Sequence, residues 1–240
     1  MRLVVLTGAG VSAESGLGTF RDVGGAWDKY DLAQVATPEG FARDPDLVLH
    51  FYNLRRANMR AARPNPAHIA LARLECALHD RMTLVTQNID DLHERAGSGP
   101  VLHMHGELSR ATCAACGHRW VAPDTMSAQD PCPSCDARAT RPDVVWFGEV
   151  PYHLADIGAM LAKADLFVAI GTSGTVYPAA GFVSEAAAHG ARTLEINLAP
   201  SEVAGAFDEC RIGPASTAVP AWVSELLDGP AAGSVDHSNP

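Results

Sequence analysis

Four cysteines in paired spacing, preceded by two histidines, carry the most informative chemistry in the sequence. The cysteines form two Cys-x-x-Cys pairs separated by fifteen residues: Cys113, Cys116, Cys132 and Cys135. This spacing is typical of a zinc ribbon. Because four thiolates complete the tetrahedral coordination of zinc, no position remains for water or substrate. We therefore predict a zinc ion that stabilises structure, beside a candidate base in the segment His103-Met104-His105-Gly106.

The composition is that of an ordinary globular protein. The chain has 240 residues, of which 47% are hydrophobic, and a formal net charge of −10. This length suits one large domain with a smaller inserted part, and the negative charge argues against direct nucleic-acid binding. The first apolar run is too short for a signal peptide, and no stretch approaches the roughly 20 apolar residues of a membrane span. We expect a cytoplasmic, monomeric protein without a membrane segment.

Short apolar runs bounded by turn residues predict a buried parallel sheet. The runs are Leu3 to Leu6, Met82 to Val85, Leu166 to Ile170 and Thr193 to Ile196, and each lies near a helix-like stretch. This alternation is typical of an α/β fold.

Two amphipathic segments between the first two runs predict helices. In residues 44–62, Asp44 can cap the helix, a proline follows in the first turn, and apolar residues recur through Leu47, Phe51 and Leu54. Asn65-Pro66 then interrupts the chain before the second helix.

Polar residues follow each predicted strand, at the edge where open α/β sheets bind ligands. The first strand runs into a G-x-G-x-x-A turn, which can direct a helix N-terminus at a phosphate. A tight turn alone would also explain these glycines, and the acidic residue expected about 20 residues further on in dinucleotide sites is missing. Helix capping would explain the polar residues at any one of the other strand ends, but four such strand ends together favour a single binding crevice. The four ends are Gly8 to Ala13, Thr86 to Asp91, Gly171 to Ser173 and Asn197 to Ala199.

Together these motifs resemble the sirtuin family from Leu3 to Leu227. The other matching segments are Thr19-Phe20-Arg21-Asp22, His105-Gly106, Val145-Trp146-Phe147-Gly148-Glu149 and the four cysteines. No single motif would suffice, but their order and spacing are specific. The resemblance implies an NAD-dependent protein lysine deacylase. In that reaction the acyl oxygen of a modified lysine attacks C1′ of the nicotinamide ribose, nicotinamide leaves, and a ribose hydroxyl then attacks the imidate.

The resemblance also implies roles for individual residues. His105 would be the general base that activates the ribose hydroxyl, which suits an imidazole with an unperturbed pKa of about 6.5. His103 is a weaker candidate for a direct role. Asn88 and Asp90 would complete the catalytic set by holding the nicotinamide ribose and carboxamide.

The remaining NAD contacts implied by the resemblance fall into four groups. They are Gly8, Ala9, Gly10, Ser12, Ala13 and Glu14 on the pyrophosphate side; Phe20, Arg21 and Trp27 near the loop that closes over the cofactor; Gln87 and Ile89 in the nicotinamide pocket; and Gly171, Thr172, Ser173, Asn197, Leu198, Ala199 and Ala215 at the adenosine end.

Tyr52 and Arg55 give the sharpest indication of the substrate. At i and i+3 of a helix, both side chains can reach one point, where the Arg fork can bind a carboxylate and Tyr can donate its hydroxyl. From the spacing alone, Tyr52 could equally pack in the core while Arg55 extends over the surface. Sirtuins with this pair remove succinyl and malonyl groups, and some also remove acetyl. The resemblance therefore implies that acyl-lysine proteins of these kinds are the substrates.

The segment Val145, Trp146, Phe147 and Gly148 resembles the edge at which sirtuins bind an extended substrate backbone. An ordinary buried strand would explain the same apolar run. Pro142, just before it, is compatible with both interpretations.

Two other functions remain open beside deacylation. Mono-ADP-ribosyl transfer uses the same cleavage of NAD, and Tyr52 and Arg55 argue against it as the main activity. A module that senses a nucleotide and recruits a partner through its zinc lobe is the second, and the presence of Asn88, Asp90 and His105 argues against it. A conventional NAD dehydrogenase is disfavoured, because the acidic residue that binds the ribose is missing.

For the organisation of the chain we predict one catalytic domain over residues 1–228, in which a small domain is inserted into a Rossmann-like parallel sheet. The core would comprise 1–30, 64–106 and 141–228, with a helical module at 31–63, a zinc ribbon at 107–140 and a disordered tail at 229–240.

Overall fold

The four predicted strands pair in one parallel sheet. The computed structural model describes residues 1–18 and 30–229, and the four strands are β1 (Leu3–Thr7), β2 (Met82–Thr86), β7 (Leu166–Ile170) and β8 (Arg192–Asn197). Two strands that the sequence did not reveal, β3 (Val101–His103) and β9 (Glu209–Ile212), extend the sheet to the order β3-β2-β1-β7-β8-β9. The strand order therefore reverses between β1 and β7, and such a switch point opens a crevice at the carboxyl ends of the strands.

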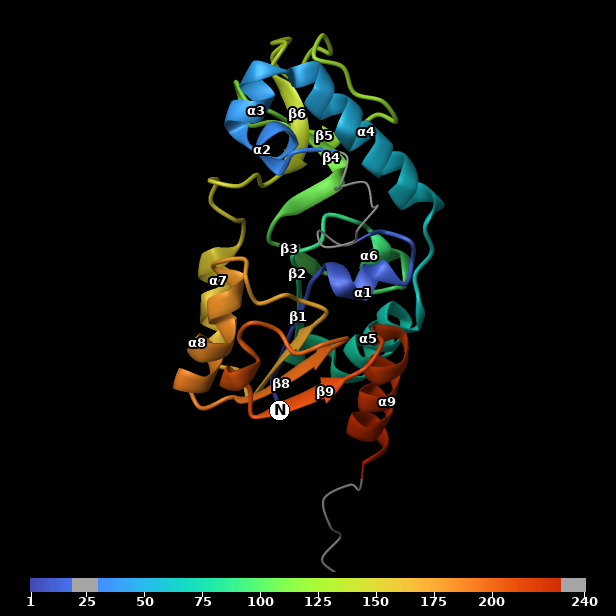
Figure 1. The fold of residues 1–240 in the computed structure, drawn as a ribbon, viewed down its shortest axis with the longest axis vertical. Coiled ribbons are helices and arrows are strands. Elements are labelled where there is room, and N and C mark those ends of the chain that lie inside the picture. Colours follow the sequence, from blue (N-terminus) through green and yellow to red (C-terminus); the bar gives the residue numbers. More distant parts are fainter. Residues whose placement is uncertain (19–29, 230–240) are drawn as a thin grey trace, which may run out of the picture.

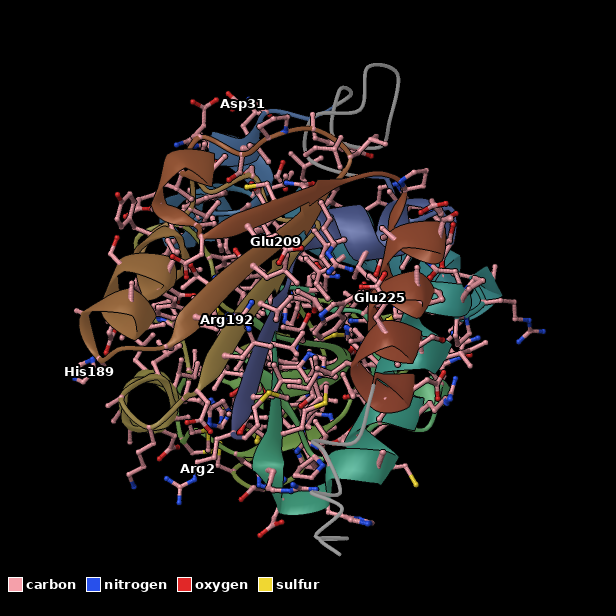
Figure 2. All side chains as sticks on the ribbon, turned by 90° about the horizontal axis from the view of Figure 1, so that it is seen from below. Arg2, Asp31, His189, Arg192, Glu209 and Glu225 are labelled. Carbon is pink, nitrogen blue, oxygen red and sulfur yellow. The ribbon has the colours of Figure 1, made fainter. Side chains whose placement is uncertain are left out.

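Helices cover both faces of this sheet. α5 (Pro66–Leu78) and α9 (Ala215–Asp228) pack together on one face, and α7 (Leu154–Leu161) and α8 (Phe182–Ala188) lie on the other. Figure 2, seen from below, shows the sheet between these two helix pairs. Side chains of β1 alternate between the two cores, Leu3 and Val5 toward α5 and α9, Val4 and Leu6 toward α7 and α8. Burial on both faces explains why the strands read as unbroken apolar runs.

A second, antiparallel sheet lies above the carboxyl ends of the first (Figure 1). It has the order β5-β4-β6, formed by β4 (Gly106–Cys113), β5 (Arg119–Val121) and β6 (Thr140–Val144). Three helices accompany it: α2 (Leu32–Val35), α3 (Pro38–Arg43) and α4 (Pro45–Ala61). Side chains of α4 form one apolar cluster with residues of β4, β6 and the segment after β6. The predicted boundaries between domains stay predictions.

The two predicted helices are present, with local capping that follows from their sequences. The Asp44 side chain accepts a hydrogen bond from the Leu47 amide at 2.9 Å at the start of α4. Asn65 caps α5, and the His68 side chain accepts a hydrogen bond from the Asn65 amide. Within α4, Leu54 is 46% exposed, whereas Arg56, two residues further on, is completely buried.

Two further short helices follow the first two strands, α1 (Ala9–Ala13) after β1 and α6 (Leu92–Arg95) after β2, and α1 borders the crevice. Across residues 1–18 and 30–229, every helix is too short or too polar to cross a membrane. The predicted loop residues Phe20, Arg21 and Trp27, and the tail from residue 230 on, lie outside the described residues.

Candidate active site

The four polar strand ends open into one cavity of about 1300 Å³, which the second sheet and α4 close from the other side. The predicted residues that line it are Ala9, Gly10, Ser12, Ala13, Glu14, Tyr52, Arg55, Gln87, Asn88, Ile89, Asp90, His105, Val145, Trp146, Phe147, Gly148, Gly171, Thr172, Ser173, Asn197, Leu198, Ala199 and Ala215. Gly8 lies directly behind this lining, where its carbonyl accepts a hydrogen bond from the Asn88 amide group. The fold thus brings together side chains that are far apart in the sequence.

The glycine turn packs tightly against the turn after β7. The Gly10 amide donates to the Gly171 carbonyl at 2.8 Å, and the Gly8 amide donates to the Ile170 carbonyl at 2.9 Å. A Cβ atom on Gly10 would lie 2.8 Å from the Gly171 Cα atom, and Gly171 itself has a φ of +61°. Both turns therefore require glycine where their backbones meet.

Asn88 and Asp90 are buried at the base of the cavity. The Asn88 side-chain amide donates to the Gly8 carbonyl at 3.0 Å and to Ser12 Oγ at 3.2 Å, and its backbone amide donates to Thr86 Oγ1. Burial raises the pKa of the Asp90 carboxyl, against the lowering effect of the Leu92 amide and the Ser12 hydroxyl. The amide and the carboxyl are therefore held in fixed directions beside the glycine turn.

His105 presents a basic nitrogen to the same cavity. Its Nδ1 lies 2.9 Å from the Gln87 carbonyl oxygen. Because a carbonyl can only accept, Nδ1 carries the proton and Nε2 keeps its lone pair. Burial lowers the pKa of His105, so the ring is neutral at pH 7. A neutral imidazole with a fixed tautomer is suited to take up a proton.

His103 does not line this cavity. Its two ring nitrogens lie 3.1 Å from the Asn88 carbonyl oxygen and 2.8 Å from Glu94 Oε1. The structure therefore does not bring His103 to a ligand in the crevice, and its place is behind Asn88.

Tyr52 and Arg55 face the cavity from α4. Tyr52 is only 3% exposed, and its hydroxyl oxygen accepts a hydrogen bond from Trp146 Nε1 at 2.9 Å. Burial raises the pKa of Tyr52, so it keeps its proton and can donate it. Arg55 Cζ lies 5.8 Å from the centre of the Phe51 ring, and burial lowers the pKa of its guanidinium. Tyr52 therefore packs in an apolar cluster, as the alternative predicted, while both side chains also line the cavity. Their role in binding a substrate stays a prediction.

The segment after β6 lines the cavity without being a strand. β6 ends at Val144, the Val145 amide donates to the His105 carbonyl at 2.9 Å, and the Phe147 amide donates to the Ala36 carbonyl at 3.0 Å. Gly148 then turns the chain with a φ of +90°. The alternative of an ordinary buried strand is wrong for these residues. Their contact with a substrate backbone stays a prediction.

The residues predicted for the adenosine end hold one another in place. The Asn197 side-chain amide donates to the Thr172 carbonyl at 2.7 Å, and the Gln87 side-chain amide donates to Thr172 Oγ1 at 3.0 Å. Ser173 Oγ lies 2.7 Å from Thr175 Oγ1. These contacts tie the ends of β2, β7 and β8 to one another across the switch point.

Comparison with known proteins supplies the family. The model of the Sir2 family matches residues 8–178. The chain belongs to the Sir2 family. An NAD-dependent protein deacylase of Caulobacter vibrioides is 58% identical over 232 residues, which cover 95% of this chain and 97% of that protein. The protein of the same name from Escherichia coli K12 is 54% identical over 237 residues, covering 98% and 85%. The crystal structure of a Sir2 homologue in complex with NAD has a TM-score of 0.87 at 36% identity, covering 95% of this chain and 90% of that one.

The four cysteines of this Sir2-family chain are positioned to bind a zinc ion. All four sulfur atoms lie within 4.8 Å of one another. The Sγ atoms of Cys113 and Cys135 are 3.7 Å apart, as are those of Cys116 and Cys132. Zinc–sulfur bonds of about 2.3 Å in a tetrahedron place neighbouring sulfurs about 3.8 Å apart. The cluster therefore fits zinc, and its four thiolates leave no open coordination position.

Sequence reasoning missed the residues that hold Trp146. The Arg141 guanidinium lies 3.6 Å from the centre of the Trp146 ring and forms an ion pair with Glu149 at 2.6 Å. Burial disfavours the charged form of Glu149, but Arg141 and the Trp146 amide lower its pKa overall. Glu149 belongs to the Val-Trp-Phe-Gly-Glu motif of this family, which was a usable signal. Nothing in the sequence distinguished Arg141 from a surface arginine.

Proposed function

We propose that this Sir2-family chain is an NAD-dependent protein lysine deacylase that removes acetyl, succinyl and malonyl groups, consuming NAD and one water and giving nicotinamide, O-acyl-ADP-ribose and free lysine. The observation that carries the proposal is the neutral His105, with Nδ1 bonded to the Gln87 carbonyl at 2.9 Å, in a cavity shared with Asn88 and Asp90. Two relatives more than 50% identical are named NAD-dependent protein deacylases.

The residues of the cavity divide the work of binding NAD. The turn from Gly8 to Glu14 would hold the pyrophosphate, and Thr172, Ser173 and Asn197 the adenosine end. NAD, when bound, supplies the ribose carbon from which nicotinamide departs. Asn88 and Asp90 would orient the nicotinamide ribose and carboxamide through directed hydrogen bonds.

His105 would accept the proton of a ribose hydroxyl at Nε2, because Nδ1 is already committed to the Gln87 carbonyl. Cysteine-bound zinc would hold the second sheet together and take no part in the chemistry. The segment from Val145 to Gly148 would bind the backbone of the substrate at the edge of the cavity.

The selectivity for acidic acyl groups rests on Tyr52 and Arg55. A succinyl or malonyl carboxylate that enters this apolar end of the cavity needs a cationic partner, because an unpaired buried charge is costly. Arg55 supplies that charge. The Tyr52 oxygen already accepts a hydrogen bond from Trp146, so the Tyr52 proton can point at the acyl group.

The test is deacylation of matched acetyl-lysine and succinyl-lysine peptides, with nicotinamide release and peptide mass as readouts. We expect both peptides to be deacylated only when NAD is present. Arg55→Met should lower kcat/KM for the succinyl peptide by about 10- to 100-fold, the value of a lost hydrogen bond to a charged group, and leave the acetyl peptide within about threefold. Arg60→Met is the control, since Arg60 lies on the same helix but pairs with Asp124 outside the cavity.

The outcomes separate this proposal from its alternatives. Equal losses on both peptides would show that Arg55 is structural. Transfer of ADP-ribose to protein without loss of the acyl group would indicate mono-ADP-ribosyl transfer. If no peptide causes nicotinamide release, the alternative of a nucleotide-binding module is favoured.

A further inference from the structure

His103 is held between two oxygen atoms that can only accept hydrogen bonds. Nδ1 lies 3.1 Å from the Asn88 carbonyl oxygen, and Nε2 lies 2.8 Å from the Glu94 carboxylate. A neutral imidazole has a single N–H group and can satisfy only one of them. The geometry therefore requires a proton on both nitrogens, which makes the ring an imidazolium. The side chain of His103 is 8% exposed, so little water is available to replace either bond.

The other histidine of the His-Met-His segment has the opposite environment. His105 faces a single acceptor, the Gln87 carbonyl, and its second nitrogen faces the cavity. The two histidines thus bind consecutive carbonyl groups of one loop, but one ring is charged and the other neutral. Environments that separate the protonation states of neighbouring groups in this way are typical of acid–base sites.

We propose that His103, as an imidazolium paired with Glu94, is a positioning residue for Asn88, and that loss of its proton sets the alkaline limit of the reaction. The proposal rests on the deacylase function proposed above. When the ring is neutral, its one remaining proton stays with the charged Glu94 acceptor, and a nitrogen lone pair then faces the Asn88 carbonyl. Repulsion between these atoms displaces the loop that carries Asn88 and Asp90.

The charges around His103 support a stable imidazolium. Burial opposes the charge, but the hydrogen bond and charge of Glu94, the Asn88 carbonyl and the charge of Glu107 raise the pKa of His103 overall. His93 on α6 and Asp90 also interact with its charge. The remaining charged and titratable groups border a cavity of about 200 Å³ on the other side of His103: Glu107, Arg110, Arg119, Asp143, Tyr152 and His153. The negative charge of Asp143 partly offsets the charges of Arg110 and Arg119, whose Nε atoms lie 3.9 and 3.3 Å from Asp143 Oδ2.

Glu94→Gln tests the proposal without touching the cavity that binds substrate. The side chain of Glu94 is 40% exposed, and glutamine keeps its shape but replaces the charged acceptor with a neutral amide that can also donate to His103 Nε2. The exposed Glu185→Gln on α8 is the control for the lost surface charge. In wild type, NMR of the His103 ring should show both nitrogens protonated at pH 7. In Glu94→Gln the midpoint of its titration should move to lower pH, whereas the control should match wild type.

The activity arm measures kcat/KM against pH with an acetyl-lysine peptide, whose acyl group does not titrate. We expect Glu94→Gln to lose the alkaline limb although its NMR midpoint falls, because without the charged acceptor the single proton of the neutral ring can stay on Nδ1 and bond the Asn88 carbonyl. One pH unit above the wild-type midpoint, kcat/KM of Glu94→Gln should then exceed that of wild type by roughly tenfold. A structural role would instead lower activity evenly at all pH values. A single N–H on His103 at pH 7, or an unmoved alkaline limb, would overturn the proposal. If wild type releases no nicotinamide while NMR still shows the imidazolium, the deacylase function has failed and not the charge state of His103.

Discussion

Arg55 and Arg56 are neighbours on α4, and replacing each by methionine should give opposite results. Arg56 is 0% exposed and makes three hydrogen bonds: Nε to the Leu108 carbonyl at 2.9 Å, Nη1 to Asn53 Oδ1 at 2.9 Å, and Nη2 to Met126 Sδ at 3.2 Å. These bonds join α4 to β4 and to the chain that follows β5. Burial lowers the pKa of Arg56 to about 10, so it is still charged at pH 7.

The free energy at stake follows from these contacts. The two bonds from the charged guanidinium to oxygen are worth about 1.5–3 kcal/mol each, so their removal costs about 3–6 kcal/mol. Asn53 Oδ1 keeps the Met126 amide as a donor, and methionine refills most of the volume while removing the cost of a buried charge. We therefore expect Arg56→Met to lower the free energy of unfolding by about 2–4 kcal/mol. Arg55→Met should change it by less than about 1 kcal/mol, because Arg55 borders the cavity.

Urea unfolding of the zinc-loaded protein, followed by circular dichroism and by tryptophan fluorescence, measures both values. Activity is then compared at urea concentrations at which both variants are folded. The ratio of desuccinylation to deacetylation should equal that of wild type in Arg56→Met and be lower in Arg55→Met. The reasoning is refuted if Arg56→Met unfolds within about 0.5 kcal/mol of wild type, or if Arg55→Met is the less stable of the two.

Three further changes probe the base, the metal and the glycine turn. His105→Tyr should abolish deacylation but keep the wild-type urea midpoint and zinc content. Because burial lowers the pKa of His105, kcat/KM of the wild type should stay constant to below pH 6.5 and fall only as Nε2 takes up a proton. A fall centred above pH 6.5 would contradict this assignment. Cys132→Ser should lower the thermal unfolding temperature. Zinc removal from the wild type by a chelator should do the same, and zinc added back to the wild type should restore it. Full activity without metal would disprove a structural role. Gly171→Ala should weaken NAD binding at least tenfold by calorimetry, because its Cβ would lie 2.5 Å from the Val11 amide nitrogen; unchanged affinity would show that the turn can move.

The parts of the fold that the sequence predicted are those whose signals are local. The runs at β1, β2, β7 and β8 are apolar because both faces of a central strand are buried. Asp44 and Asn65 mark helix starts through their own capping bonds. The strands β3 and β9 were missed because they lie at the edges of the sheet, where β3 has three residues and β9 is mostly exposed.

The positions of side chains within the site were harder to predict. The carboxyl ends of parallel strands meet by topology, so the convergence of Gln87, Gly171 and Asn197 followed from the order of elements alone. Whether His103 or His105 faced the cavity depended on the direction of each ring, which the fold decides and the spacing does not. Arg56 reads like Arg55 in the sequence, and only the packing of α4 on β4 separates a structural arginine from one in the cavity.

The proposed acyl end of the cavity depends on two parts of the chain that fold around different constraints. Tyr52 comes from α4, whereas Trp146, whose Nε1 bonds the Tyr52 hydroxyl at 2.9 Å, lies two residues after β6 and is held by Arg141 of that strand. β6 pairs with β4 up to Cys113, one of the four zinc ligands. Under the proposed function, zinc can therefore take no part in the chemistry and still affect which acyl group is removed. Loss of the metal should loosen β4 and β6 first, so that the Tyr52 hydroxyl loses its fixed direction before His105 and the glycine turn are disturbed. In a stepwise zinc titration, desuccinylation should accordingly fall before NAD binding does. A parallel loss of both would show that the two sheets unfold as one unit.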